Sequence, residues 1–142
     1  MQLLTRRSVL ALSLAVPALG FADEADDAEG AASGVRRAIV RQEFDDLYDN
    51  RVSDIFKSKV SKAVFIQNLR TGRANVGEQQ QATLTSHTFS ETDPASGYRG
   101  RIYAFDYHVR YERAAFFERL IVVKDPDGIF RLAGIWANPA PN

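Results

Sequence analysis

The sequence predicts an α+β protein in which N-terminal helices pack on a curved antiparallel sheet of about four strands. Two observations lead to this fold class. Apolar residues recur at helical spacing up to about residue 77 and at every second position after it. Turn-forming clusters divide the second part into segments of strand length, and helices followed by consecutive strands are typical of the α+β class.

The first 22 residues have the order of segments found in a cleavable signal peptide. Arg6 and Arg7 precede a compact apolar run at residues 9–19, and small residues follow up to Ala22. The run is too short to span a bilayer, which predicts cleavage near Ala22 rather than a stable membrane anchor. We therefore expect an exported protein, periplasmic or secreted. The arginine pair is compatible with both general and twin-arginine export.

Composition divides the rest of the chain into two parts. Residues 23–34 contain five acidic side chains and no large apolar one, which predicts a flexible acidic leader. Residues 35–142 carry enough apolar residues for a modest core, and we expect them to form a single α+β domain.

Three helices are expected before residue 77. The first covers residues 35–48, and a break at Asp49 and Asn50 separates it from a short second helix near residues 52–57. Ser61 is a plausible N-cap for a third helix that extends to about Arg73. The side chains expected to face inward from these helices are Val40, Phe44, Leu47, Tyr48, Ile55, Phe56, Val64, Phe65 and Leu69.

Four strands are expected after Gly77, at residues 81–91, 98–111, 114–124 and 129–137. The turn cluster at residues 93–97 separates the first two. A tight connection at Glu112 and Arg113 joins the second to the third. Residues 125–128, Asp-Pro-Asp-Gly, are a strong hairpin signal, because proline presets the turn and glycine accepts a positive φ.

The two hairpins also predict a register. If Tyr111 faces Ala114 and Asp125 faces Ile129, the apolar side chains of three strands share one concave face, and Tyr107, Glu118 and Trp136 form one cross-strand row. That face would carry Tyr103, Phe105, Leu120, Val122, Phe130, Leu132 and Trp136. A curved sheet wrapped around helices suggests a cystatin-like or nuclear-transport-factor-like cone.

Glu118 is the sharpest chemical feature of this row, because it is an acid on an otherwise apolar face. A desolvated carboxylate there has a raised pKa and suits general acid or base catalysis, with Tyr107 as a hydrogen-bond donor. The alternative is a structural ion pair between Glu118 and an arginine of the helical half, Arg70 or Arg73. The candidate pocket is therefore lined by Tyr103, Phe105, Tyr107, Glu118, Trp136, Arg70 and Arg73.

The opposite face of the second strand carries Asp106 and His108, which would oppose Arg119 and Phe117. We interpret this pair as the polar outer face of a half-exposed strand, with metal binding as the alternative. The chain has no cysteine and two histidines without carboxylates at ligand spacing, so no metal site is predicted.

Other function classes lack their sequence signals. The chain has 18 basic and 18 acidic residues, scattered rather than clustered, which argues against nucleic acid as a partner. No phosphate-binding glycine loop and no nucleophile elbow is present, so we expect no cofactor.

Several motifs together are similar to the bacterial domain-of-unknown-function 4019 family. They are an Arg-x-x-x-Gly segment at Arg73 and Gly77, an acid before a β run at residues 118–123, and a closing Asp-Gly-x-Phe-Arg-Leu-x-Gly pattern at residues 127–134. The chain has Phe65, Phe130 and Ile135 where the family usually shows Trp, Trp and Tyr. The resemblance covers residues 36–137 and implies a small exported protein; the family brings no assigned activity.

Three functions stay open on the sequence. The first is a non-catalytic module that binds a periplasmic partner protein or a small apolar ligand. The second is a pocket enzyme of the isomerase or dehydratase type with Glu118 as its general base. The third is a structural homodimer that packs the outer face of the sheet against a second copy.

Overall fold

The computed structural model describes residues 16–141 of the 142-residue chain. Within this range the helices are α1 (Val16–Val40), α2 (Phe44–Arg51), α3 (Asp54–Lys57) and α4 (Lys62–Val76). The strands are β1 (Gln79–Asp93), β2 (Tyr98–Tyr111), β3 (Ala115–Lys124) and β4 (Phe130–Pro139). They form one antiparallel sheet in the order β1-β2-β3-β4. The predicted α+β class, with helices packed on a four-stranded sheet, is confirmed.

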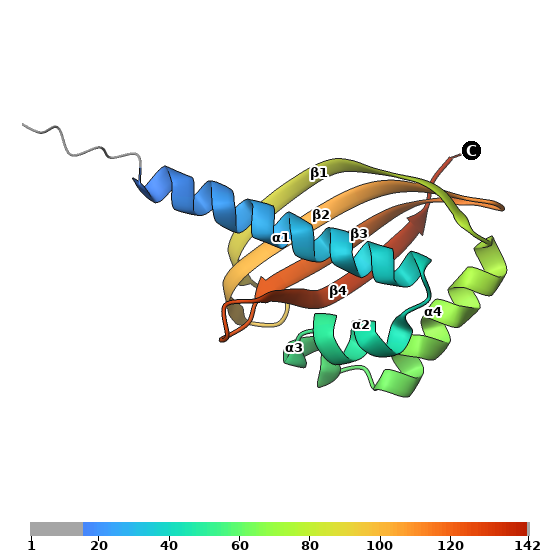
Figure 1. The fold of residues 1–142 in the computed structure, drawn as a ribbon, viewed down its shortest axis with the longest axis horizontal. Helices are drawn as coiled ribbons and strands as arrows, with labels where there is room; N and C mark the ends of the chain where they lie inside the picture. The colour runs from blue at the N-terminus through green and yellow to red at the C-terminus, as the bar shows by residue number, and fades with distance from the viewer. Residues whose placement is uncertain (1–15, 142) are drawn as a thin grey trace, which may run out of the picture.

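Helix α1 lies across one face of the curved sheet, and α2 and α3 lie along the edge formed by β4 (Figure 1). We call the face that α1 covers the inner face and the opposite side the outer face. A parallel bridge between Val52 and Leu132 attaches the α2–α3 connection to β4. Ser53 is fully buried there and donates a hydrogen bond to Asp125 at 2.7 Å. The helices and the sheet therefore share one apolar core.

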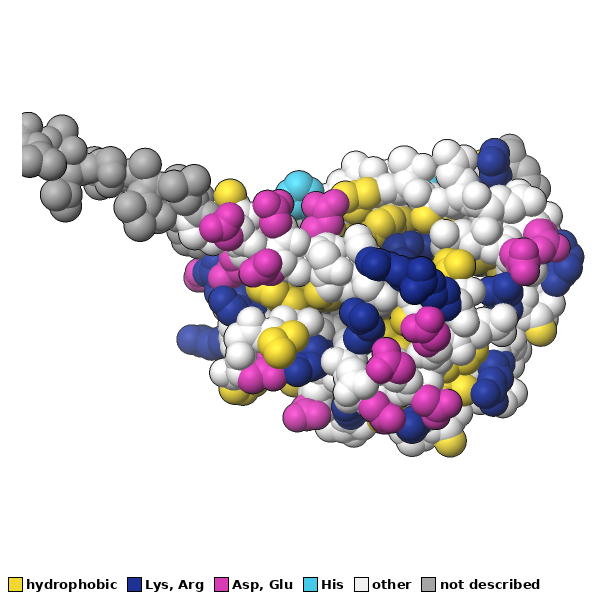
Figure 2. Space-filling model, viewed as in Figure 1, with side chains coloured by type: hydrophobic (Ala, Val, Ile, Leu, Met, Phe, Trp, Pro, Cys, Tyr) yellow, Lys and Arg dark blue, Asp and Glu magenta, His cyan; other side chains and the backbone are white. Residues whose placement is uncertain are grey.

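The flexible leader predicted for residues 23–34 is wrong, because these residues form the middle of α1. Ala28 and Ala32 are completely buried and Val35 is 1% exposed. Small side chains let the helix approach the sheet closely, and the resulting contacts compensate for the entropy of ordering the segment. The acidic side chains of this segment are mostly on the exposed side of α1, over its N-terminal half (Figure 2).

The N-terminal prediction is only partly covered by the structure. Residues 1–15 of the predicted signal peptide lie outside the described residues, and residues 16–22 form the first turns of α1. Cleavage near Ala22 stays a prediction. Within residues 16–141, no helix combines the length and the apolar character needed to cross a membrane.

The single helix predicted for residues 35–48 is two helices. Gln42 adopts a left-handed φ of 58°, and Glu43 donates its backbone N–H to the carbonyl of Ala38 at 2.9 Å. This is the hydrogen-bond pattern of a Schellman C-cap, which ends α1 even though the position lacks glycine. The predicted break at Asp49 and Asn50 is wrong, because α2 continues through both to Arg51.

Helix α4 begins where the sequence predicts. The Ser61 hydroxyl accepts a hydrogen bond from the backbone N–H of Val64 at 3.3 Å, and Gly77 follows the helix with a φ of 82°. Phe65 is buried and its ring lies 5.5 Å from that of Tyr48. The inward orientation predicted for Val64 is wrong, because it is 53% exposed. One residue is a rotation of about 100° on a helix, so Val64 and Phe65 cannot both face the core centre.

The β2–β3 register is the predicted one. Tyr103 pairs with Val122, Phe105 with Leu120, and Tyr107 with Glu118. The Asp-Pro-Asp-Gly hairpin is also confirmed, since Asp125 donates its N–H to the carbonyl of Ile129 and Gly128 has a φ of 83°. Alternation and turn chemistry therefore place the inner-face residues of β2 and β3 correctly.

The predicted β3–β4 register is right beside the hairpin and wrong beyond it. Val122 pairs with Leu132 as expected, but Ile121 pairs with Gly134, so β4 contains one extra residue. This bulge moves Trp136 opposite Arg119 on the outer face, where it is 54% exposed. Trp136 and Phe105 thus lie on opposite faces, and the predicted row of Tyr107, Glu118 and Trp136 does not exist. Glycine within a strand is a common site for such a bulge.

The N-terminal half of α1 is held to the sheet by an ionic cluster. Glu24 accepts hydrogen bonds from Arg101 at 2.7 Å, from the Tyr103 hydroxyl at 3.0 Å and from Lys124 at 3.3 Å. Burial alone raises the pKa of Glu24, but these three hydrogen bonds outweigh it and hold the pKa below its ordinary value of 4.5. The charged carboxylate is therefore the form that the fold stabilises.

Two substitutions in α1 test whether residues 23–34 are an ordered helix. Ala32→Leu should lower the free energy of unfolding by about 1 to 3 kcal/mol, because the larger side chain does not fit against the sheet. Gly30→Ala should raise it by about 0.5 to 1 kcal/mol, because Gly30 is exposed and alanine favours the helix. Urea denaturation measures both. If neither substitution changes stability, residues 23–34 are a flexible leader after all.

The Glu24 cluster predicts a pH-dependent contribution to stability. A carboxyl group whose pKa is lower in the folded state stabilises the fold above its unfolded pKa, and this contribution disappears as pH falls through the folded pKa. We therefore expect Glu24→Gln to be less stable than the wild type at pH 7 and to approach wild-type stability when the pH is lowered well below 4.5. Thermal unfolding across this range measures it, and a stability difference independent of pH would contradict it.

Candidate functional site

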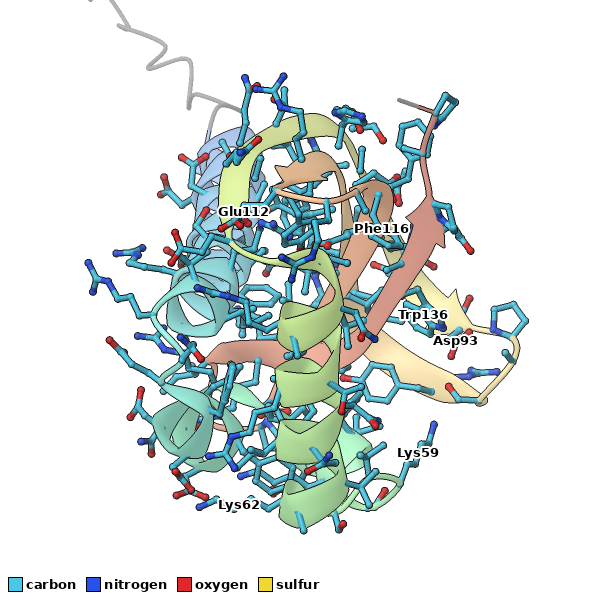
Figure 3. The ribbon with its side chains drawn as sticks, turned by 90° about the vertical axis from the view of Figure 1, so that its right-hand side faces the viewer. Lys59, Lys62, Asp93, Glu112, Phe116 and Trp136 are labelled. Carbon is cyan, nitrogen blue, oxygen red and sulfur yellow. The ribbon has the colours of Figure 1, made fainter. Side chains whose placement is uncertain are left out.

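A cavity of about 310 Å³ lies between the C-terminal end of α1, helix α4 and the inner face of β3 and β4. It exists because α4 packs mainly against α2 rather than on the sheet. Figure 3 shows α4 in front of the sheet, with Phe116 and Trp136 to one side of it. The apolar walls include Ile39, Phe44, Leu69, Val76, Phe116 and Ile135.

One wall of the cavity carries an ion pair between α1 and β3. Arg36 donates to one carboxylate oxygen of Glu118 at 2.6 Å, and the two side chains are 10% and 11% exposed. Arg36 also donates to the side-chain oxygen of Gln79 at 2.6 Å. The Tyr111 hydroxyl donates to the other oxygen of Glu118. The pair and its two hydrogen-bond partners thus connect α1 to β1, β2 and β3.

Two tyrosine side chains complete the surroundings of the pair. The Arg36 guanidinium lies 4.6 Å from the centre of the Tyr107 ring, which adds a cation–π contact. Burial raises the pKa of Tyr111, and the negative charge of Glu118 raises it further, so Tyr111 stays a protonated donor. Both oxygens of Glu118 therefore have a donor, as a buried carboxylate requires.

Two polar atoms beside the pair lack a partner. The Nε of Arg36 and the hydroxyl of Tyr107 are buried and make no hydrogen bond within the described part of the chain. Burial raises the pKa of Tyr107, so its hydroxyl also stays protonated. Unsatisfied buried donors cost about 1 to 3 kcal/mol each, which makes this the least satisfied polar region of the core.

The structure brings together part of the predicted site. Tyr103, Phe105 and Tyr107 are buried on the inner face beneath α1, and Glu118 lines the cavity. Trp136 borders the cavity from the strand edge, but its register position is on the outer face.

The predicted partner of Glu118 is wrong. The arginine is Arg36 of α1, whereas Arg70 is exposed and does not line the cavity. Arg73 does line the cavity, but it pairs with Glu78 at 3.3 Å. The helix predicted for residues 35–48 already contains Arg36, but the face on which Arg36 lies follows from Ala28 and Ala32, which the sequence pattern assigns to a leader. Ala28, Ala32 and Arg36 are spaced by four residues, and this spacing alone places all three on one face of a helix.

The described residues contain no candidate metal site. Among residues 16–141, no set of three or more histidine, aspartate or glutamate side chains is arranged to hold a metal ion. What the cavity offers chemically is apolar surface and one neutralised ion pair.

The chain belongs to the family described as "Protein of unknown function (DUF4019)", whose model matches residues 31–135. The match includes residues 31–40 of α1, the remaining helices and nearly all of the sheet. No curated protein and no solved structure matches the chain.

The Arg36–Glu118 pair should contribute much more to stability than the surface pairs. Arg36→Met leaves Glu118 buried without its cation and should lower the free energy of unfolding by about 3 kcal/mol. Combining it with Glu118→Leu should cost less than the sum of the two single changes, because the pair is then removed as a unit.

The control is Glu78→Gln, which breaks the exposed Arg73–Glu78 pair and should cost less than about 1 kcal/mol. Urea denaturation of the wild type, the two single variants and the double variant gives the coupling free energy between Arg36 and Glu118. Glu78→Gln is measured in the same way. Additive effects of the Arg36 and Glu118 substitutions would show that the two groups do not interact as described.

Proposed function

We propose that the protein is a non-catalytic binding module that holds a small apolar molecule in the cavity between α1, α4 and the sheet. The observation that carries the proposal is the cavity itself, about 310 Å³ with predominantly apolar walls. Ligand sites are concave, mostly apolar and supplied with a few polar groups that orient the ligand. The Arg36–Glu118 pair, with Gln79 and Tyr111, supplies those groups.

Access to the cavity supports a ligand that enters from water. Val40 and Gly72 both line the cavity and are exposed, one on α1 and one on α4. A path to solvent therefore lies between these two helices. A concave site of this size suits a small molecule better than the surface of a partner protein, which buries far more area.

The contacts of Glu118 favour binding over catalysis. A general base needs a carboxylate oxygen that can reach the substrate proton, and both oxygens of Glu118 already accept hydrogen bonds, from Arg36 and Tyr111. Tyr107, the other candidate group, lies under the Arg36 guanidinium and does not line the cavity. We therefore propose no reaction.

We also propose that binding takes place after export, in the periplasm or outside the cell. The support is the order of charged, apolar and small residues before Ala22. The curved sheet around α1 supports the further proposal of a cystatin-like or nuclear-transport-factor-like cone.

Filling the cavity tests the proposed function. The Cβ of a residue at position 72 meets no atom within 4 Å, so Gly72→Phe can place its ring in the cavity without a backbone clash. The neutral dye N-phenyl-1-naphthylamine, whose emission rises in apolar surroundings, should bind the wild type and lose at least tenfold in affinity for Gly72→Phe. Thermal stability should not fall, because an exposed helical glycine has been replaced.

The matched control is Gly30→Phe, which puts the same side chain on the exposed side of α1 and away from the cavity. It should bind the dye as the wild type does. Equal binding by the wild type and Gly72→Phe, or no binding by either, would exclude the cavity as an apolar ligand site.

A further inference from the structure

The outer face of the sheet carries a second hollow, a groove of about 540 Å³, whose lining shares Glu118 and Trp136 with the cavity. Its floor contains one residue from each strand. Ser86 pairs with Asp106, Asp106 with Arg119, and Arg119 with Trp136, so the four side chains form a continuous cross-strand row. Strand positions hold such side chains in fixed relative places, which is what a binding site needs.

Two aromatic rings border this row. Trp136 is 54% exposed and Phe117 is 50% exposed, which is unusual for side chains of this size. The Trp136 ring lies over Gly134, where a Cβ atom would be only 2.4 Å from it. Glycine at this position therefore lets the indole lie against the strand while the side chain stays half-exposed. The bulge in β4 is what brings the ring to this side of the sheet.

The polar floor between the rings is an ion pair supported by a serine. Arg119 donates to both oxygens of Asp106, at 2.7 and 2.9 Å, and Ser86 donates to one of them at 2.9 Å. The hydrogen bonds from Arg119 hold the pKa of Asp106 below its ordinary value, so the pair is ionised and its charges cancel. The charged side chains of the groove, Asp106, Arg119 and Glu118, are thus all in ion pairs, the last of them with Arg36.

We propose that this groove binds a neutral oligosaccharide. Sugar rings combine a flat face of C–H groups, which packs on aromatic rings, with an edge of hydroxyl groups, which bonds to carboxylate, guanidinium and amide groups. The groove supplies both, in Trp136 and Phe117 and in the Asp106–Arg119 pair with Ser86 and Asn138.

Other ligand classes fit these groups less well. An anionic ligand would meet the carboxylate of Asp106 as well as its partner, so the groove gives it no net attraction. A purely apolar ligand would bury the ion pair without replacing its hydration, which is unfavourable. This inference does not rest on the function proposed for the cavity, although Glu118 and Trp136 line both hollows.

The chain contains one tryptophan, Trp136, so intrinsic fluorescence reports on the wall that the groove shares with the cavity, and Gly72→Phe separates the two. Chitotetraose, cellotetraose and maltotetraose should be titrated into the full chain, with calorimetry as a second readout. We expect at least one of them to bind and to shift the emission of Trp136. Phe117→Ala and Asp106→Asn should each weaken binding about tenfold or more. If none of the three binds, the proposal is overturned.

The control variant is Phe89→Ala. Phe89 is also an exposed aromatic residue, at 42%, but it pairs with Tyr103 on the inner-face side and does not line the groove. It should bind the oligosaccharide with wild-type affinity. Gly72→Phe, which fills the cavity, should also leave oligosaccharide binding unchanged. Loss of binding in either variant would contradict the groove as the site.

Two further outcomes would replace the sugar with another occupant. If light scattering shows a dimer that Trp136→Ala dissociates, the groove is an interface between copies of this chain. If a neutral tetrapeptide such as tetra-alanine shifts the Trp136 emission as strongly as the oligosaccharides do, the groove is a peptide site. Either result overturns the proposal.

Discussion

The inner face of the sheet is strongly apolar, and α1 is the element that removes most of it from water. Its small side chains, Ala28 and Ala32, let the helix axis lie close to β2, β3 and β4. The helix then continues along the same face to Arg36, which it delivers to Glu118. Because α1 occupies the middle of the face, α4 packs on α2 instead, and the space left between α4 and the sheet is the cavity. The closeness of α1 to the sheet therefore determines both the core and the candidate site.

Much of the fold is predictable from local signals, and the errors have identifiable physical causes. The twofold alternation in β2 predicts the β2–β3 register correctly, and the turn at residues 125–128 predicts the β3–β4 register as far as Val122 and Leu132, because side-chain direction and turn type restrict the pairing there. Helix α1 is not predicted over residues 23–34, because alanines carry little hydrophobic signal although they pack well. The placement of Trp136 fails because a bulge at Gly134 reverses every side chain after it, and one glycine in a strand does not specify which way the chain adjusts.

The candidate site, like the fold, is predictable from the sequence only in part. Glu118 is recognisable from the sequence as an acid on an apolar face, and the expectation that it pairs with an arginine of the helical half is correct in kind. The identity of that arginine depends on residues 23–34 of α1, the part of the helix that the sequence pattern does not reveal. The exposed groove depends on the bulge, so the alternation pattern alone predicts the wrong face for Trp136. In both cases a tertiary feature decides which side chains meet.

Residue-resolved native-state hydrogen exchange tests the packing of α1 most directly. If α1 is an integral part of the core, the backbone amides of Ala28, Ala32 and Val35 should exchange as slowly as those of Leu120 and Val122 in the middle of β3, because all of them would open only on global unfolding. Exchange of the α1 amides at the rate of an unstructured peptide, while the β3 amides stay protected, would show that the helix does not cover the sheet. Neither the cavity nor the Arg36–Glu118 pair would then form as described, because both depend on this packing.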